Sequence, residues 1–172
     1  MSNRGFTLIE MMLGLAVLAV LALAALPGLR GYLQDCRRTA TVNALAHAVH
    51  SARQLAGVLG RNVVLCPTRD GADCSGALDW SGLLVLRTDE AAAFDPEPAP
   101  RFIRLAVERS QQSVRSNRDA IRFTPLTPAA STATLTVCDA RGPRSARAVI
   151  VSRSGRPRIS DRDAAGRFLV CP

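Results

Sequence analysis

The sequence predicts an α+β protein in which one long N-terminal helix is followed by an antiparallel β-sheet domain. Three observations lead to this prediction. An apolar stretch near the N-terminus is long enough to span a membrane, and an amphipathic pattern continues it to about residue 60. After residue 61, short apolar and β-branched runs alternate with turn residues, and no helical pattern separates them. The predicted architecture is therefore a helix that packs on a sheet.

The apolar stretch runs from Met11 to Leu26 without a polar side chain, and Phe6 to Ile9 extends it beyond one carboxylate, Glu10. A helix over both segments is roughly 30 Å long, about the thickness of the hydrocarbon core of a bilayer. We therefore expect a transmembrane or filament-core helix over residues 6–29. Its amphipathic continuation is expected over residues 30–60, where glycines end the helical pattern.

The residues before this stretch do not fit a secretory signal peptide, whose cleavage site follows its apolar segment. Here the only plausible site lies between Gly5 and Phe6, so cleavage would remove residues 1–5 and leave the apolar helix on the mature protein. Glu10 would lie among apolar side chains, where an ionised carboxylate is costly unless it is paired. We expect its partner to be the amino group at Phe6 of a neighbouring copy. The alternative is an ordinary N-terminal anchor with an acid near the membrane interface.

The N-terminal run Arg4-Gly5-Phe6-Thr7-Leu8-Ile9-Glu10 resembles the class III leader and mature start of type IV pilins and type II secretion pseudopilins. The resemblance implies that a prepilin peptidase cleaves after Gly5 and N-methylates Phe6, and that Glu10 aligns each subunit with the next during assembly. It also implies a single-pass protein of the bacterial inner membrane with a periplasmic C-terminal domain. Assembly with other major and minor pilins would then place it in an extracellular pilus. Pro27 resembles the kink of the pilin helix.

Five cysteines follow the apolar stretch, and a domain carried across the inner membrane enters an oxidising compartment, so we expect disulfides. Cys66 and Cys74 flank a loop rich in Pro, Asp and Gly, and they could close a small ring. A bond between Cys138 and Cys171 would tie the C-terminus to an interior strand. With these two bonds formed, Cys36 would be the remaining cysteine. A metal site is the alternative, but no C-x-x-C occurs and both histidines lie elsewhere, so no metal or other cofactor is expected.

The net charge of +8 is distributed unevenly along the chain. Residues 6–100 hold seven Arg and nine acids, whereas residues 101–172 hold fourteen Arg and five acids. A one-sided basic field of this kind attracts polyanions such as nucleic acid. A solvated basic face without a partner is the alternative interpretation of the charge alone.

Motifs after residue 61 narrow the resemblance to the GspH/FimT family of minor pilins, which implies that residues 61–172 form the globular domain of that family. Within the family, the sequence is most similar to the FimT group, whose studied members bind DNA during natural transformation. A Gly-Arg-x-Arg motif near the C-terminus is implicated there, and it is present here as Gly155-Arg156-Pro157-Arg158. The other motifs that carry the resemblance are Asn62-Val-Val-Leu-Cys-Pro67, Trp80-x-Gly82, Ile121-Arg-Phe-Thr-Pro125, Leu135-Thr-Val-Cys-Asp139 and the run from Arg147 to Arg156.

The chemistry of the Gly-Arg-x-Arg motif suits a phosphate contact. On an extended backbone, Arg156 and Arg158 would point to the same side, and Pro157 between them stiffens that conformation. Guanidinium groups bind phosphate oxygens bidentately and stay charged at any pH. Gly155 lets the backbone turn and come close to a phosphate. We expect five further arginines to cluster around the motif and widen its footprint: Arg141, Arg144, Arg147, Arg153 and Arg162.

No aromatic residue interleaves with these arginines along the sequence, so we do not expect bases to stack on the protein. The predicted partner is therefore DNA, bound through its phosphate backbone without sequence preference and with a steep dependence on salt. The competing function is a structural minor pilin or pseudopilin, similar to GspH, that primes or caps a type IV pilus or a type II secretion pseudopilus without binding DNA. An enzyme is not expected, because no catalytic constellation, Walker loop or metal-ligand spacing occurs.

Overall fold

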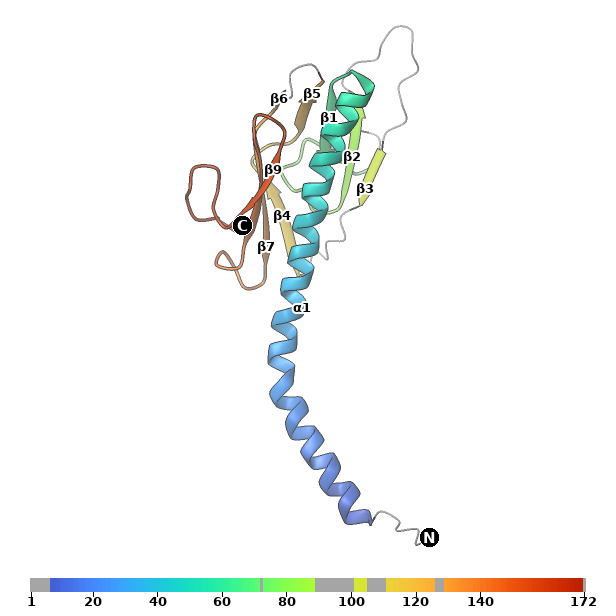
Figure 1. The fold of residues 1–172 in the computed structure, drawn as a ribbon, viewed down its shortest axis with the longest axis vertical. Coiled ribbons are helices and arrows are strands. Elements are labelled where there is room, and N and C mark those ends of the chain that lie inside the picture. Colours follow the sequence, from blue (N-terminus) through green and yellow to red (C-terminus); the bar gives the residue numbers. More distant parts are fainter. Residues whose placement is uncertain (1–6, 72, 89–100, 105–110, 126–128, 172) are drawn as a thin grey trace. The chain divides into compact units, whose positions relative to one another are not determined.

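The computed structural model describes residues 7–71, 73–88, 101–104, 111–125 and 129–171 (Figure 1). By its internal contacts the chain divides into two compact units, Met1–Arg37 and Arg38–Pro172. One helix, α1 (Leu8–Leu59), begins in the first unit and ends in the second. Every strand of the described residues belongs to the second unit. The predicted class, a long helix followed by antiparallel sheet, is confirmed.

The first half of α1 exposes its apolar side chains. Leu13, Val20 and Leu23, for example, are each more than half exposed. By length and composition this helix is able to cross a membrane. The α-helical backbone continues through residue 27 and ends at Leu59, after which Gly60 adopts a left-handed φ of 63°.

Two antiparallel sheets form the β-rich part of the second unit, where the sequence predicted a single sheet region (Figure 1). Six strands coincide, to within one residue at an end, with the apolar and β-branched runs that the sequence predicts as strands, at 62–66, 80–87, 101–107, 120–124, 132–138 and 147–152. The strands Gln112–Ser116, Ala129–Ala130 and Pro157–Ser160 were not predicted. Sheet A has the order β3 (Arg101–Arg104), β2 (Leu83–Thr88), β1 (Val63–Pro67), β5 (Ile121–Thr124) and β6 (Ala129–Ala130). Sheet B has the order β4 (Gln112–Ser116), β7 (Ala133–Asp139), β8 (Arg147–Val151) and β9 (Pro157–Ser160).

A single core joins the second half of α1 to both sheets. Ala48, Val49 and Ala52 of the helix are completely buried, and they belong to one apolar cluster with side chains from β1, β2 and β5 of sheet A and β4, β7 and β8 of sheet B. Trp80 joins this core from the loop before β2, and its indole N–H donates to the carbonyl of Arg118 over 2.9 Å. The helix therefore covers the inner face of each sheet.

The outer face of each sheet carries one of the two predicted disulfides, and both are confirmed. Cys66 on β1 is bonded to Cys74, beside the small cluster that covers the outer side of sheet A. Cys138 on β7 is bonded to Cys171 in a second small cluster on the outer side of sheet B. Cys36 is free and exposed. The C-terminal segment is thus held against the outer face of sheet B.

Asp139, at the end of β7, ties the β7–β8 loop to the helix. Its carboxylate is only 2% exposed and accepts hydrogen bonds from the guanidinium of Arg141 (2.6 Å) and the hydroxyl of Ser145 (2.6 Å). Arg38 of α1 lies 3.9 Å from the same carboxylate and donates to the carbonyl of Ser145. Burial opposes ionisation of Asp139, but the hydrogen bonds and the charge of Arg141 outweigh it and lower the pKa to about 2.

We predict that Asp139→Asn lowers the free energy of unfolding by about 2 kcal/mol at neutral pH, because the folded protein loses this network. The pKa of Asp139 is lower in the folded state than its ordinary value of 3.8, so its contribution is present above about pH 4 and is lost as the pH falls towards 2. Denaturant unfolding at several pH values measures this. The difference between wild type and variant should close in acid, whereas Asp161→Asn, at an exposed acid, should change little at any pH. A difference that does not depend on pH would contradict the role given to this carboxylate.

The disulfides give a second prediction. Because the Cys138–Cys171 bond closes a loop with a sequence separation of 33, its loss should cost about 2–4 kcal/mol. The double variant Cys138→Ser/Cys171→Ser should therefore melt at a clearly lower temperature than the wild type, and reducing agent should lower the melting temperature of the wild type further than that of this variant. Cys36→Ser is the control and should melt like the wild type. Equal melting of the oxidised and reduced wild type would refute the stabilising role of both bonds.

Candidate nucleic-acid interface

The Gly-Arg-x-Arg motif lies at the turn between β8 and β9, the last two strands of sheet B (Figure 1). Within the turn, the amide of Gly155 donates to the carbonyl of Ser152 (2.8 Å), and the amide of Ser152 donates to the carbonyl of Arg156 (3.1 Å). The Ser152 hydroxyl also accepts from the amide of Arg156 (3.2 Å). Arg158 lies within β9, so the extended conformation predicted around Pro157 is confirmed. These bonds hold the arginine backbone in one conformation.

Gly155 is required by the conformation and the packing of this turn. Its φ is +72°, which side chains other than that of glycine rarely adopt. It is buried, and a Cβ built on it would meet Arg53 of α1, Phe123 of β5 and Ala130 of β6 at 3.4–3.5 Å. The predicted turn is therefore confirmed, but the side of Gly155 that would carry a Cβ faces the protein. Close approach of its backbone to a phosphate stays a prediction.

Three arginines project from this braced turn. Arg153, Arg156 and Arg158 are exposed, and none forms an ion pair with any residue that the structure describes. The backbone of Arg153 is anchored to sheet A, because its carbonyl accepts from the amide of Ala130 over 2.6 Å. Arg158 is paired with Ile150, which belongs to the outer cluster of sheet B, so Arg158 lies on the outer face of this sheet.

The other arginines do not gather here, and the expectation that they cluster around the motif is wrong for three of them. Arg141 and Arg144 lie in the β7–β8 loop, at the opposite end of β8 from the β8–β9 turn, and Arg141 is ion-paired with Asp139. Arg147 is paired with Val137, a core residue, and therefore points to the inner side of sheet B. We therefore expect these three residues to lie outside the DNA contact of the turn. Arg162, by contrast, lies just after β9 and near the outer face of sheet B.

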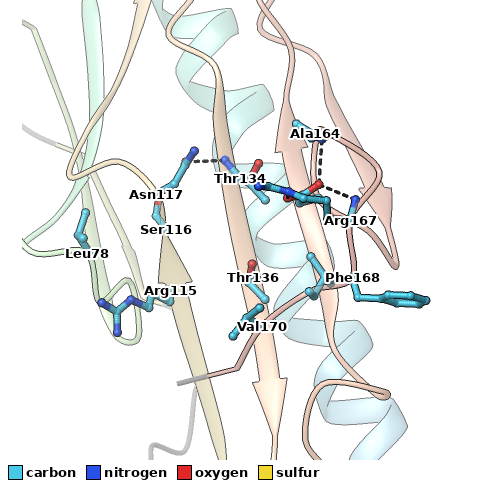
Figure 2. Close-up of a pocket in the computed structure, with 13 residues that line it drawn as sticks. Leu78, Arg115, Ser116, Asn117, Thr134, Thr136, Ala164, Arg167, Phe168 and Val170 are labelled. Carbon is cyan, nitrogen blue, oxygen red and sulfur yellow. Dashed lines mark hydrogen bonds and ion pairs between the residues drawn. The ribbon is translucent and has the colours of Figure 1, made fainter.

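A groove on the outer face of sheet B adjoins Arg158. One hollow of about 250 Å³ is lined by Arg158, Thr132 and Ser152, and a second of about 630 Å³ is lined by Arg115, Thr136 and the segment 163–170. Both hollows share Asn117, Thr134 and Ala164, so they lie next to each other. Figure 2 shows Thr134 and Thr136 of β7 between Asn117 on one side and the C-terminal segment on the other.

The contribution of β4 to this surface was not predicted from the sequence. The amide of Thr134 donates to Asn117 Oδ1 over 2.8 Å, which fixes the end of β4 beside the start of β7. Arg115 on β4 and Arg118 just after it are exposed, and Arg115 lines the larger hollow. The polar sequence of β4 gave no strand signal, although the alternation of buried and exposed residues in Gln112–Ser116 is the pattern of an edge strand.

Glu10, the predicted assembly residue, lies in the first turn of α1. The Thr7 amide donates to the carboxylate of Glu10 over 2.9 Å, and the amide of Glu10 donates to the Thr7 hydroxyl over 3.4 Å. This reciprocal pair is a capping box, which satisfies backbone donors at the start of the helix. The sequence Thr7-Leu8-Ile9-Glu10 contained that signal. Gly5 and Phe6 lie outside the described residues.

The fold and the N-terminus together define a pilin-like protein: a long apolar helix, a methylation-type leader and an antiparallel β domain. Residues 1–26 match the prokaryotic N-terminal methylation motif, and residues 41–155 match the family described as type II transport protein GspH. The chain therefore belongs to the GspH family. It is a minor pilin or pseudopilin, a structural subunit of a type IV pilus or of type II secretion. The part of the chain that the structure describes contains no cluster of three metal-binding side chains.

Solved structures agree in fold. The type IV minor pilin FimU of Pseudomonas aeruginosa (strain PAO1) is similar in two crystal forms, with TM-scores of 0.55 and 0.51 and 13% identity. These matches cover 75% and 71% of this chain and 92% and 91% of FimU. The solution structure of E. coli GspH matches with a TM-score of 0.48 and 11% identity, over 76% of this chain and 92% of that one. No curated protein sequence matches this chain significantly.

The packing around Gly155 leads to a prediction with a matched control. Gly155 and Gly166 both have positive φ, but only the Cβ position of Gly155 is crowded. Asn tolerates a positive φ, so Gly166→Asn should change the free energy of unfolding by less than about 0.5 kcal/mol. Gly155→Asn should lower it by about 1–3 kcal/mol, because the atoms beyond Cβ would press into Arg53 and Phe123. Equal effects of the two substitutions in denaturant unfolding would show that the turn is not braced in this way.

Proposed function

We propose that this minor pilin binds DNA through the arginines of the β8–β9 turn and thereby serves DNA uptake in natural transformation. The observation that carries the proposal is the group Arg153, Arg156 and Arg158: three exposed guanidinium groups without ion pairs among the described residues, on a turn fixed by hydrogen bonds and packing. Because the backbone is ordered before DNA arrives, little conformational entropy is lost on binding. Contacts of this kind are made with phosphates, so binding is independent of sequence and weakens steeply with salt.

The charge of the surroundings supports the proposal. Residues 101–172 hold fourteen Arg and five acids, so the domain attracts a polyanion over a distance. Of these acids, Asp139 is ion-paired with Arg141, and Asp163 with Arg167. Hydrogen bonds from the amide and guanidinium of Arg167 lower the pKa of Asp163, so this pair persists in mildly acidic solution. The arginines of the turn make no such pair with a described residue and are available for phosphate.

We further propose the processing, membrane insertion and assembly that the leader implies. The prepilin peptidase cleaves between Gly5 and Phe6 and methylates Phe6, while the apolar half of α1 anchors the protein in the inner membrane. The domain faces the periplasm, and the protein then enters the pilus with other pilins. The exposed apolar side chains from Leu8 to Leu26 support this path, because they need lipid or neighbouring pilin helices to cover them. In this account Glu10 pairs with the terminal amino group of a neighbouring subunit.

The DNA-binding proposal predicts the behaviour of Arg156→Gln/Arg158→Gln. With the full-length processed protein in a nonionic detergent, this variant should bind labelled duplex DNA about tenfold or more weakly, because two charge-assisted contacts are lost. The slope of log affinity against log salt should fall by about 2. Arg144→Gln, at an exposed arginine of the β7–β8 loop, is the control for loss of an arginine charge outside the turn and should bind like the wild type.

Two outcomes would contradict this proposal. If the wild type does not bind DNA at low salt, the protein is a structural subunit whose basic face meets another protein. If Arg144→Gln weakens binding as much as the change of a single turn arginine, the attraction is diffuse and the β8–β9 turn has no special role.

The assembly role of Glu10 is separable from its place in the capping box. Gln at this position still caps the helix, but it carries no charge to pair with the neighbouring amino group. We therefore predict that Glu10→Gln leaves the protein in the membrane fraction and strongly reduces its amount in sheared pili. Quantitative immunoblotting of both fractions measures this. Normal incorporation of Glu10→Gln, together with a loss for Glu10→Ala, would show that only the cap matters.

A further inference from the structure

We propose that the groove on the outer face of sheet B takes an unpaired DNA strand, with a base stacked on Phe168, so that the protein prefers single-stranded to duplex DNA. This inference rests on the proposed DNA binding and names the form of DNA that the site selects. It depends on three features of the described residues: the adjacency of the two hollows of the groove, the donors that line them, and the exposed ring of Phe168.

The groove connects the β8–β9 turn with the far side of the sheet. Arg158 lines its smaller hollow and Arg115 its larger one, and Asn117, Thr134 and Ala164 line both. A strand whose phosphates contact the turn can therefore continue along the sheet without leaving the surface. The two terminal guanidinium groups are placed to bind phosphates at either end of this path.

The groove offers donors along most of its length. Its floor carries the short hydroxyl side chains of Thr134 and Thr136, and its sides carry the amide of Asn117 and guanidinium groups. The one carboxylate among the lining residues is Asp163. Its oxygens already accept from the guanidinium of Arg167 (2.8 Å) and from the amides of Ala165 and Arg167 (both 2.9 Å). The groove thus combines arginine, hydroxyl and amide donors for phosphates with apolar side chains such as Leu78 and Val170, which suit the bases of an unpaired strand.

Phe168 supplies the stacking surface. Its side chain is 76% exposed, and Figure 2 shows its ring projecting away from β7 at the side of the larger hollow. The guanidinium of Arg162 lies 4.3 Å from the ring centroid, on one face of the ring, while most of the ring remains open. Along the sequence no aromatic residue interleaves with the arginines, and stacking was therefore not expected. In the folded domain, however, Phe168 contacts Arg162 across a short turn.

Duplex and single-stranded DNA use this surface differently. A duplex keeps its bases stacked inside and presents phosphates on a convex outer surface, so it reaches the projecting Arg153 and Arg156 but not the recessed floor at Thr134. An unpaired strand exposes its bases, and one of them can stack on Phe168 while its phosphates contact the groove. The arginines of the turn therefore serve both forms of DNA, whereas Phe168 serves only the unpaired strand.

The test compares one labelled strand with the duplex made from it, using the full-length processed protein in a nonionic detergent and fluorescence anisotropy at one salt concentration. The wild type should bind the single strand more tightly. Phe168→Leu keeps an apolar side chain but removes the ring, and it should weaken single-strand binding about fivefold or more while leaving duplex binding unchanged. Phe168→Tyr should behave like the wild type. Val58→Ala, at an exposed apolar residue of α1 that does not line the groove, is the control and should have no effect.

Each other outcome has a defined meaning. If the wild type binds duplex as tightly as the single strand, or if Phe168→Leu binds the single strand normally, the groove is not a strand site, and DNA binding by the turn still stands. If Phe168→Leu weakens both forms equally, the ring has no selective role and this inference is wrong. If neither form of DNA binds the wild type, the proposed function itself fails, and this inference fails with it. Because Phe168 is exposed, none of these variants should impair folding.

Discussion

The packing of the second half of α1 against both sheets is the contact on which the rest of the domain depends. Apart from Leu45, the buried side chains of this half are small or β-branched, and Ala48, Val49 and Ala52 are completely buried against the two sheets. Small side chains let both sheets approach the same helix closely, so one core can be shared. The inner faces are thereby used for folding. What remains for binding is the outer faces and the turns at the ends of the strands.

The β8–β9 turn shows how this constraint reaches the candidate site. Gly155 rests against Arg53 of the helix, Phe123 of sheet A and Ala130, and the carbonyl of Arg153 is bonded to β6. The turn therefore contacts the helix and both sheets, although it belongs to only one of them. Its arginines project from a fixed base, and Arg158 lies on the face that the helix does not cover.

Much of this arrangement was predictable from the sequence, and the exceptions have physical reasons. The long helix, six strands and both disulfides followed from apolar periodicity, turn residues and the expected oxidising compartment. The strands β4 and β9 did not, because Gln112–Ser116 and Pro157–Ser160 are polar edge strands held by pairing with β7 and β8. Proximity along the chain was also a poor guide to which residues surround the motif. Arg147 is near the motif in sequence but lies at the other end of β8. Asn117 is distant from it in sequence but lines the groove. A sequence contains no direct record of such contacts.

The chain thus divides its chemistry between its two units. The first unit carries the features of a pilin that must be processed, inserted in a membrane and assembled: the leader, Glu10 and an apolar helix surface. The second unit exposes a basic turn and an adjoining groove on the outer face of sheet B. The proposed DNA capture is therefore compatible with assembly in a filament, because it would use a different part of the chain.

Photo-cross-linking tests this division most directly. The full-length processed protein would be irradiated with photoreactive DNA, and the cross-linked peptides would be identified by mass spectrometry. The account predicts cross-links in the segment 153–168, which holds the β8–β9 turn and the segment beside the groove, and none in the β7–β8 loop at residues 140–146. Cross-links concentrated in that loop, or spread evenly over the basic residues, would contradict the claim that the braced turn is the DNA-binding site.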